Sequence, residues 1–369
     1  MRIAHLDTGR DWRGGQAQAL HLLHGLSGRG HRCVLLAPPG PLLERAGAAG
    51  IPVMRWAPLG EWDVVAALRA AAALRRFQPD VVHCHSAHAH AVGVPAARLA
   101  RAPGVVVSRR VDFAVAGNPF SRLKYRLPVG RYLCISRGVL AVMRRAGIPE
   151  ARLALVPSGV ELAGAGRGWE AGPAADLRAM LGVAPGAPVV GTVAALAPHK
   201  NHANLLRAAA AVVVRRPDVR FAWVGEGECR LALERERAAL GLERHVHLLG
   251  FRGDALGLLA QFTVFALSSY LEGLCTSLLD AQTLGVPVVA TAVGGIPDVV
   301  ADGLNGRLVP SGDPEAMARA LVEALEHPEE SRRMAERARG TVEAFGVDRM
   351  VERTLEEYRA VLQEQARGT

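Results

Sequence analysis

The most specific chemical pattern in the sequence is a loop that carries one carboxylate, followed by a helix that carries a second. Glu272 lies in the loop, and Asp280 lies eight positions later, about one turn into a helix that we expect to begin near Thr276. The amide groups at the start of such a helix favour a phosphate. Residues 268–281 therefore predict a site for a phosphate-bearing ligand beside two carboxylates.

A lysine and a glycine earlier in the second half suit the same kind of ligand. Lys200 is the only lysine of that half, and it stands between an expected strand (189–193) and an expected helix (204–214). A compact positive charge at such a loop end suits a diphosphate. Gly225 ends the next expected strand, where glycine allows contact with a planar ring, and a simple turn is the alternative.

The first half offers a glycine pair between its first expected strand and first expected helix. Gly14 and Gly15 let the backbone approach a ligand closely, and the start of a helix favours an anion. The spacing is not GxGxxG, so the fingerprint of a dinucleotide site is absent. An ordinary tight turn remains the alternative.

Histidines and arginines follow two further strands of the first half. His83, His85, His88 and His90 form the densest histidine cluster, but no carboxylate near them in the sequence supports a metal site. We favour a hydrogen-bonding histidine that faces the ligand, with metal binding and core packing as the alternatives. Arg109 and Arg110 follow the next strand, and Arg suits bidentate binding of phosphate.

Short apolar runs alternate with longer helical segments along the whole chain, which predicts βαβ units and parallel sheets. The expected strands are 3–6, 33–37, 81–83, 105–108, 132–135, 153–156, 189–193, 221–224, 246–249, 263–267, 288–290 and 306–309. We therefore expect an α/β protein of two doubly wound Rossmann-like domains that face each other across a cleft. The expected segments are an N-terminal domain (1–165), a linker (163–175), a C-terminal domain (176–345) and a final helix (346–369).

Composition narrows the class of protein. Of 369 residues, 50% are hydrophobic and 21% are charged, which suits globular domains and argues against disorder. The five cysteines form no CxxC pair, so a disulfide framework and a structural zinc are not expected. We expect no signal peptide, and no membrane-spanning helix because uncharged runs such as 281–297 are broken by glycines and prolines.

Charge is distributed unevenly along the chain. Residues 1–180 hold 24 Lys and Arg against 11 Asp and Glu, a net +13, whereas residues 181–369 have a net charge of −4. A basic stretch with apolar residues between its charges contributes Arg122, Lys124, Arg126 and Arg131. Such a stretch suits an anionic membrane surface, and a solvated charged face is the alternative. No nucleic-acid-binding motif is present, so nucleic acid is not an expected partner.

Taken together, these motifs resemble the retaining, nucleotide-sugar-dependent glycosyltransferases of family 4, which have the GT-B fold. The resemblance covers nearly the whole chain and is strongest over 189–312. It rests in the second half on His199-Lys200-Asn201, Val224-Gly225-Glu226-Gly227, Leu249-Gly250-Phe251, Glu272-Gly273-Leu274 and Gly294-Gly295-Ile296-Pro297. In the first half it rests on Trp12-Arg13-Gly14-Gly15, Val82-His83-Cys84-His85 and Pro157-Ser158-Gly159-Val160.

The resemblance implies a role for each candidate residue. Lys200 would neutralise the donor diphosphate, Glu272 would contact the transferred sugar, and Asp280 would bind the ribose hydroxyls. The remaining donor-binding residues would be Gly273, Leu274, Cys275 and Thr276 through their amides, together with Gly225, Gly14 and Gly15.

Three positions depart from the family pattern. Asp280 replaces the usual Glu of the Glu-x7-Glu motif, and Ala195 replaces an Arg that often precedes the motif lysine. We expect Arg109 or Arg110 to supply the phosphate contact that Ala195 lacks. Arg109 also stands where many members carry a His, so we include Arg109 and His85, with His88 as an alternative, among the candidates beside the reacting sugar.

The expected function is transfer of a hexose from a nucleotide sugar, with retention, to a cell-envelope glycan or lipid-linked acceptor of the lipopolysaccharide type. Glu272, Lys200, Arg109 and His85 are the expected catalytic residues. We expect no metal and no cofactor, and a cytoplasmic location, peripheral at the inner face of the membrane. The alternatives are a catalytically silent GT-B scaffold and a GT-B-like sugar-nucleotide epimerase or phosphorylase.

Overall fold

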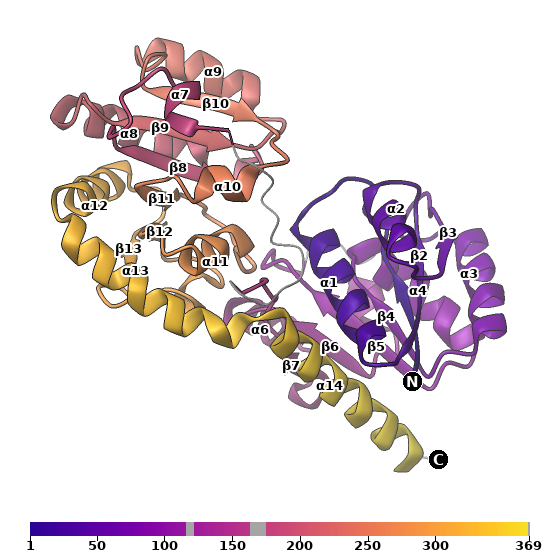
Figure 1. Cartoon of the computed structure of the whole chain (residues 1–369). Coiled ribbons are helices and arrows are strands. Elements are labelled where there is room, and N and C mark those ends of the chain that lie inside the picture. Colours follow the sequence, from indigo (N-terminus) through magenta and orange to yellow (C-terminus); the bar gives the residue numbers. More distant parts are fainter. Residues whose placement is uncertain (116–121, 163–174, 368–369) are drawn as a thin grey trace. The chain divides into compact units, whose positions relative to one another are not determined.

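The computed structural model describes residues 1–115, 122–162 and 175–367 (Figure 1). The chain forms two compact units. Unit 1 comprises Met1–Gly159 and Gly346–Thr369, and unit 2 comprises Val160–Phe345. The predicted linker, 163–175, lies outside the described residues except for Ala175, and the final helix belongs to unit 1.

Unit 1 is built on a parallel sheet of seven strands in the order β3-β2-β1-β4-β5-β6-β7. The strands are β1 (Arg2–Leu6), β2 (Arg32–Ala37), β3 (Val53–Arg55), β4 (Val81–Cys84), β5 (Gly104–Arg109), β6 (Arg131–Cys134) and β7 (Leu153–Leu155). Its helices are α1 (Gly14–Gly28), α2 (Pro41–Ala48), α3 (Val64–Phe77), α4 (Ala87–Leu99), α6 (Arg137–Arg145) and α14 (Val347–Arg367). Two 3₁₀ turns, η1 (Lys124–Arg126) and η2 (Glu150–Arg152), lie between them.

Helix α14, drawn in yellow in Figure 1, completes the core of unit 1. It packs against α1, β5 and β6 and contributes Met350, Val351, Leu355, Tyr358 and Val361 to the same apolar cluster as α1 and the sheet. Because these side chains recur every three or four positions, one face of the helix is buried. The last helix therefore belongs to the core of the first unit.

Unit 2 has a six-stranded parallel sheet in the order β10-β9-β8-β11-β12-β13. The strands are β8 (Val189–Val193), β9 (Arg220–Val224), β10 (Val246–Gly250), β11 (Val264–Leu267), β12 (Val288–Thr291) and β13 (Arg307–Val309). The helices are α7 (Leu177–Met180), α8 (His202–Arg215), α9 (Arg230–Ala239), α10 (Ala255–Leu259), α11 (Thr276–Thr283), α12 (Pro314–Glu326) and α13 (Pro328–Val342). Three 3₁₀ turns complete the unit, namely η3 (Pro198–Lys200), η4 (Ile296–Asp298) and η5 (Glu343–Phe345).

Each sheet has a point at which the strand order reverses. In unit 1 the chain leaves β1 towards β2 and β3 and returns to the other side at β4, and in unit 2 the same happens between β8 and β11. Loops that follow the two strands at such a point diverge and leave room for a ligand at the carboxyl ends of the strands. The strand order therefore indicates where each unit binds, independently of any motif.

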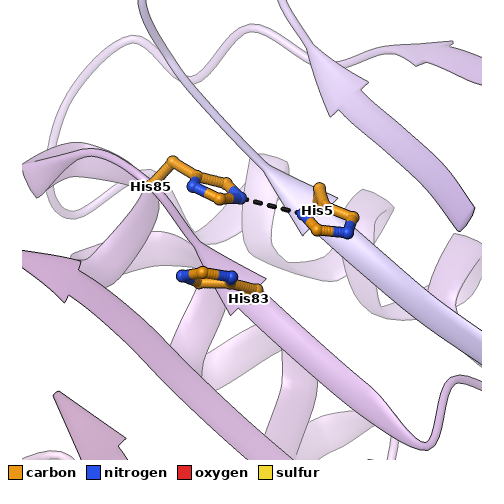
Figure 2. A group of neighbouring side chains, drawn as sticks. All are labelled: His5, His83 and His85. Atoms are coloured by element: carbon orange, nitrogen blue, oxygen red, sulfur yellow. Dashed lines mark hydrogen bonds between the residues drawn. The ribbon is translucent and has the colours of Figure 1, made fainter. Parts of the chain in front are cut away.

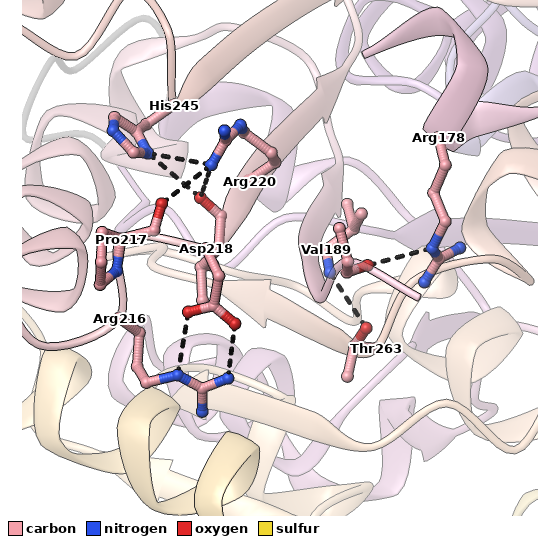
Figure 3. A network of polar contacts seen from close by, with 10 residues as sticks. Arg178, Val189, Arg216, Pro217, Asp218, Arg220, His245 and Thr263 are labelled. Atoms are coloured by element: carbon pink, nitrogen blue, oxygen red, sulfur yellow. Dashed lines mark hydrogen bonds and ion pairs between the residues drawn. The ribbon is translucent and has the colours of Figure 1, made fainter. Parts of the chain in front are cut away.

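Polar contacts hold the amino ends of two strands of unit 2, β8 and β9, in place (Figure 3). Asp218 accepts two hydrogen bonds from the Arg216 guanidinium, at 3.0 and 2.8 Å, and Arg220 donates to the carbonyl of Pro217 at 3.1 Å. In the same figure, Thr263 Oγ1 accepts the amide hydrogen of Val189 at 3.0 Å. These contacts lie at the amino ends of β8 and β9, whereas ligands bind at the carboxyl ends of such strands, so we assign them to the fold.

Two features of unit 1 differ from the sequence-based expectation. Strand β3 was not predicted, because its three residues are all exposed and form no buried apolar run. The proposed basic stretch is only partly at the surface: Lys124 is buried and pairs with Glu61, and Arg131 is buried and pairs with Glu357 and Glu364 of α14. Within residues 1–115, 122–162 and 175–367, no helix is long and apolar enough to cross a bilayer.

Candidate active site

Lys200 and Glu272 meet at the point of strand reversal in unit 2. Lys200 ends η3 in the segment after β8, and Glu272 lies in the loop after β11. The Lys200 ammonium forms an ion pair with Glu272 Oε2, and only 14% and 9% of the two side chains are exposed. Ser269 Oγ donates to the same carboxylate oxygen at 3.2 Å. A cation and an anion are thus held together where little water screens them.

Backbone contacts fix the two loops that carry this ion pair. Ser268 Oγ donates to the carbonyls of Lys200 and Asn201, at 3.1 and 2.9 Å, and the amide of Tyr270 donates to the carbonyl of His199 at 3.0 Å. Asn201 has a φ of 50°, a left-handed conformation that Asn tolerates better than most residues. The position of the lysine is therefore set by the backbone of the neighbouring loop.

The start of α11 lies directly after Glu272. Cys275 is the N-cap, no side chain caps the helix within the described chain, and the first turn holds no acidic residue. Burial raises the pKa of the Cys275 thiol, the charge of Glu272 raises it further, and the charge of Lys200 lowers it, so the helix start lies close to the ion pair. The residues of this segment are Gly273, Leu274 and Cys275, which are buried, and Thr276, which begins the helix.

Asp280 lies farther along α11 and is partly buried. Burial, and after it the charge of Glu161, raises the pKa of Asp280 to about 7. The carboxyl group is therefore close to half-protonated at neutral pH, whereas an ordinary Asp is fully ionised. A group in this state can both donate to and accept from hydroxyl groups.

Gly225 occupies a position that only glycine can fill. Its φ is 147°, and a Cβ added there would lie 1.9 Å from the carbonyl oxygen of Ala194. Its amide donates to the carbonyl of Gly250 at 2.8 Å. The end of β9 thus approaches the loop that leads from β8 towards Lys200.

The glycine pair of unit 1 begins helix α1. Gly14 and Gly15 are its first two residues, Arg13 is the N-cap, and no side chain caps the helix within the described residues. The sequence analysis missed Asp7, which orders this loop: Asp7 Oδ1 accepts the amide of Gly9 at 2.6 Å and Gln16 Nε2 at 3.2 Å. Its position at the carboxyl end of β1 is the signal that could have identified it.

His85 lies within a buried cluster of three histidines (Figure 2). His5 on β1 and His83 on β4 are partners in the strand register, and His85 follows β4 directly. The three side chains are at most 4% exposed, and His5 Nδ1 lies 2.9 Å from His85 Nε2. Burial lowers the pKa of His5 to about 3 and lowers the pKa values of His83 and His85 strongly, so all three rings are neutral.

The cluster has the composition of a metal site, since one nitrogen from each ring lies within 4.8 Å of the others. Its hydrogen bonds, however, already use one ring nitrogen of His5, one of His85 and both of His83. His83 Nδ1 lies 2.6 Å from Tyr358 Oη and His83 Nε2 lies 2.8 Å from Ser108 Oγ. Arg110 also acts on His83 and His85 through its positive charge, which opposes a bound cation. We therefore describe the cluster as a hydrogen-bonded polar layer.

The two arginines after β5 differ in their surroundings. Arg109 Nη2 donates to the carbonyl of Phe113 at 2.5 Å, so Arg109 is tied to its own loop. Arg110 runs beside the start of α1, because a Cβ on Gly15 would lie 3.7 Å from Arg110 Cδ. His88, the alternative to His85, is exposed on α4. Arg110 therefore lies beside the start of α1 and acts through its charge on buried His85, whereas His88 is exposed.

Two family models together match most of the chain. The model for glycosyl transferases group 1 matches residues 175–341, and the model for glycosyltransferase family 4 matches residues 12–163. The 2-deoxystreptamine N-acetyl-D-glucosaminyltransferase of Streptomyces fradiae is 32% identical over 94% of this chain and 90% of its own length. The lipopolysaccharide core biosynthesis glycosyltransferase LpsE of Rhizobium meliloti is 28% identical over 93% and 94%.

Solved structures share the fold over the whole chain. HepE of Anabaena, in complex with UDP and glucose, has a TM-score of 0.84 at 21% identity and covers 98% of this chain and 100% of its own. A sucrose-phosphate synthase of Thermosynechococcus elongatus has a TM-score of 0.78 at 19% identity, with coverage of 98% and 99%. At sequence identities of 21% and 19%, the structural similarity shows a shared fold and no more.

Proposed function

The chain belongs to the group 1 glycosyl transferases of the GT-B fold, and from that premise we propose that it transfers a hexose from a nucleotide sugar to a cell-envelope glycan or lipid-linked acceptor, with retention. The observation that carries this proposal is the nearly buried pair of Lys200 and Glu272 at the strand reversal of unit 2. It combines a cation for a diphosphate with a carboxylate for sugar hydroxyls.

The proposed chemistry is departure of a nucleoside diphosphate from the anomeric carbon. Negative charge grows on the leaving oxygen, and Lys200 and the start of α11 would stabilise that charge more in the transition state than in the ground state. Glu272 would hold the transferred sugar, and Asp280 the ribose hydroxyls. In this proposal the protein's own groups supply the positive charge, and no metal or cofactor is required.

Retention is the finer part of the proposal. We favour attack by the acceptor on the face from which the diphosphate leaves, with the leaving phosphate taking the acceptor proton. A covalent glycosyl intermediate on Glu272 is the alternative route to retention. The anomeric configuration of the product, measured by proton NMR, tests retention, and isolation of a glycosyl adduct on Glu272 would contradict same-face attack.

The proposed acceptor is a glycan or lipid-linked glycan of the lipopolysaccharide type at the inner face of the cytoplasmic membrane. LpsE supports this choice, as does a 28% identical Escherichia coli relative described as a galactosyltransferase acting on a diphosphoundecaprenol-linked sugar. Unit 1 carries an exposed apolar surface, which we name the α3 surface and which consists of Leu59, Trp62, Val64, Val65 and Leu68. Exposed Arg69, Arg75 and Arg76 lie on the same helix, so the surface suits anionic lipid.

The experiment that tests the donor is a thermal-shift panel of UDP-, GDP-, ADP- and CMP-sugars. We expect one nucleotide sugar to stabilise the wild type, because a ligand at about 100 times its Kd adds about 2.7 kcal/mol to the free energy of unfolding. The Lys200→Ala/Glu272→Ala double variant should show no such shift. Equal shifts in both proteins would remove these residues from the site, and a wild type that responds to no nucleotide sugar would favour the silent scaffold.

A further inference from the structure

Ser269 carries a buried hydroxyl group to which the proposed function gives no role. It lies in the loop after β11, its side chain is fully buried, and its Oγ donates to Glu272 Oε2 at 3.2 Å. The same carboxylate oxygen pairs with the ammonium group of Lys200. A charged donor and a neutral donor therefore meet at one oxygen of the group proposed to hold the transferred sugar.

The backbone of Ser269 is held by residues at the ends of two further strands. Thr291, the last residue of β12, donates from Oγ1 to the Ser269 carbonyl at 2.6 Å, and Ser311, which follows β13, donates to the same carbonyl at 3.3 Å. The amide of Gly295 donates to the carbonyl of Glu272 at 3.0 Å. The loop after β11 is thus tied to the segments that follow β12 and β13.

The two donors to Glu272 differ in how freely they can move. Lys200 reaches the carboxylate through a long flexible stem, so its ammonium group can turn from the carboxylate to a diphosphate. Ser269 has a short side chain on a backbone that is held at its carbonyl, so its hydroxyl group stays in place. A nearly buried carboxylate that loses its donors is costly. Ser269 is therefore the donor that can remain on Glu272 while Lys200 binds a ligand.

We propose that Ser269 is a positioning residue that keeps the Glu272 carboxylate oriented towards the transferred sugar while Lys200 binds the leaving diphosphate. The inference rests on the proposed function, which assigns the sugar to Glu272 and the diphosphate to Lys200. In this role Ser269 acts through Glu272 and not through a ligand contact of its own. Its loss should therefore reduce what the sugar contributes to binding and spare what the diphosphate contributes.

Isothermal titration calorimetry of the full-length chain separates the two contributions. The probes are the nucleotide sugar that stabilises the wild type in the thermal-shift panel and the corresponding nucleoside diphosphate. The ratio of their affinities measures what the sugar adds. We expect Ser269→Ala to lower this ratio by about tenfold, because a hydrogen bond to a charged group is lost, and to leave the diphosphate affinity nearly unchanged. Ser269→Cys, which has a weak donor of similar size, should give an intermediate ratio.

Ser268→Ala is the matched control, because this neighbouring serine holds the lysine and not the carboxylate. Ser268 Oγ donates to the carbonyls of Lys200 and Asn201, at 3.1 and 2.9 Å. We expect Ser268→Ala to weaken the diphosphate and the nucleotide sugar by the same factor, so that the ratio of the two affinities stays constant. A constant ratio in Ser269→Ala, or the same change of ratio in both variants, would overturn the inference.

Thr291→Val provides a second variant that leaves Ser269 itself in place. It removes the hydroxyl group that donates to the Ser269 carbonyl, so it should lower the affinity ratio in the same direction as Ser269→Ala and by a smaller factor. Far-UV circular dichroism of each variant shows that it is folded. A folded Thr291→Val protein in which the diphosphate affinity falls and the ratio stays constant would contradict the proposed role of Ser269.

A measurement without ligand separates failure of this inference from failure of the proposed function. In a double-mutant cycle of Ser269→Ala and Glu272→Ala, followed by urea unfolding, the double variant should lose less stability than the sum of the single variants. Strictly additive losses would overturn the positioning of Glu272 by Ser269, whether or not a nucleotide sugar binds. A wild type that binds no nucleotide sugar would remove the proposed function. Binding that needs Glu272 but keeps its affinity ratio in Ser269→Ala would leave the proposed function standing and overturn the inference.

Discussion

At the scale of residues, Lys200 and Glu272 form an ion pair in which each charge stabilises the other. Each charge is nearly buried and would be costly alone. Because the two neutralise each other, the nearly buried pair is stable, and in the proposed function a diphosphate and a sugar would replace these internal contacts. The pair therefore has a structural role as well as the proposed role in binding.

A double-mutant cycle measures that structural role. We expect Lys200→Ala and Glu272→Ala each to lower the free energy of unfolding by about 3 kcal/mol, because each leaves an uncompensated, nearly buried charge. The double variant should be destabilised by clearly less than the sum of the two. Urea unfolding of the four proteins gives these values, and strictly additive losses would show that the two charges do not interact.

Asp280 predicts a pH dependence. Its pKa is raised to about 7, so between about pH 4 and 7 the folded protein holds a proton that the unfolded chain has lost. The free energy of unfolding should therefore fall as the pH rises through this range, by at most about 1.4 kcal/mol per unit. Asp280→Asn should remove this contribution. Glu161→Gln should lower the pKa of Asp280, so the free energy of unfolding should stop falling at a lower pH.

Urea unfolding from pH 5 to 8 checks this prediction. Its sign follows from the native state binding more protons than the unfolded state, so protonation stabilises the fold. Parallel pH profiles for the wild type and Asp280→Asn would show that this carboxyl group titrates normally.

At the scale of elements, helix α14 is fastened to the sheet of unit 1 by polar as well as apolar contacts. Tyr358 Oη bonds His83 Nδ1 at 2.6 Å inside the core, and Arg131 on β6 pairs with Glu357 and Glu364. The helix that ends the chain therefore touches the histidine layer directly. The packing of α14 and the arrangement of the three histidines should therefore depend on each other.

Tyr358→Phe tests that coupling. Loss of the hydroxyl leaves His83 Nδ1 buried without a partner, so we expect a loss of about 1–3 kcal/mol in the free energy of unfolding. Tyr270→Phe, at a tyrosine that is 45% exposed, is the matched control and should change little. Equal effects of the two changes would argue that the Tyr358 hydroxyl contributes nothing specific.

The elements were largely predictable from the sequence, and the polar layer was not. All twelve predicted strands occur, with bounds within one residue of the observed ones, because buried parallel strands are continuous apolar runs. Lys200 and Glu272 follow such strands, so their neighbourhood could be expected. The contact of His5 with His85 depends on β1 pairing with β4, a register that no local pattern specifies. Likewise, nothing in the sequence shows that Lys124 pairs inward with Glu61.

At the scale of the whole molecule, charge and apolar exposure coincide in the first half of the chain. Residues 1–180 have a net charge of +13, and the α3 surface exposes 49% of Trp62 and 55% of Leu68. Apolar side chains beside arginines gain from both acyl chains and anionic headgroups. We therefore place the proposed membrane contact at α3 and not at the partly buried stretch 122–131.

Vesicle flotation tests this placement. The wild type should bind vesicles that contain anionic lipid and dissociate as salt is raised, because screening weakens the contact. Leu68→Asp together with Val65→Asp should reduce binding at least tenfold, whereas Val214→Asp, at a valine of unit 2 that is 85% exposed, should not. Binding that ignores salt, or the same loss from both changes, would exclude the α3 surface.

In the proposed function, this transferase uses Lys200 to release a nucleoside diphosphate from its donor sugar. The most direct measurement is the rate of nucleoside diphosphate release from the stabilising nucleotide sugar, compared between the wild type and Lys200→Ala at saturating donor. We predict that the rate falls by about 10²–10³, as when one preorganised electrostatic contact is removed. An undiminished rate in a folded Lys200→Ala protein would show that Lys200 does not assist departure of the nucleoside diphosphate.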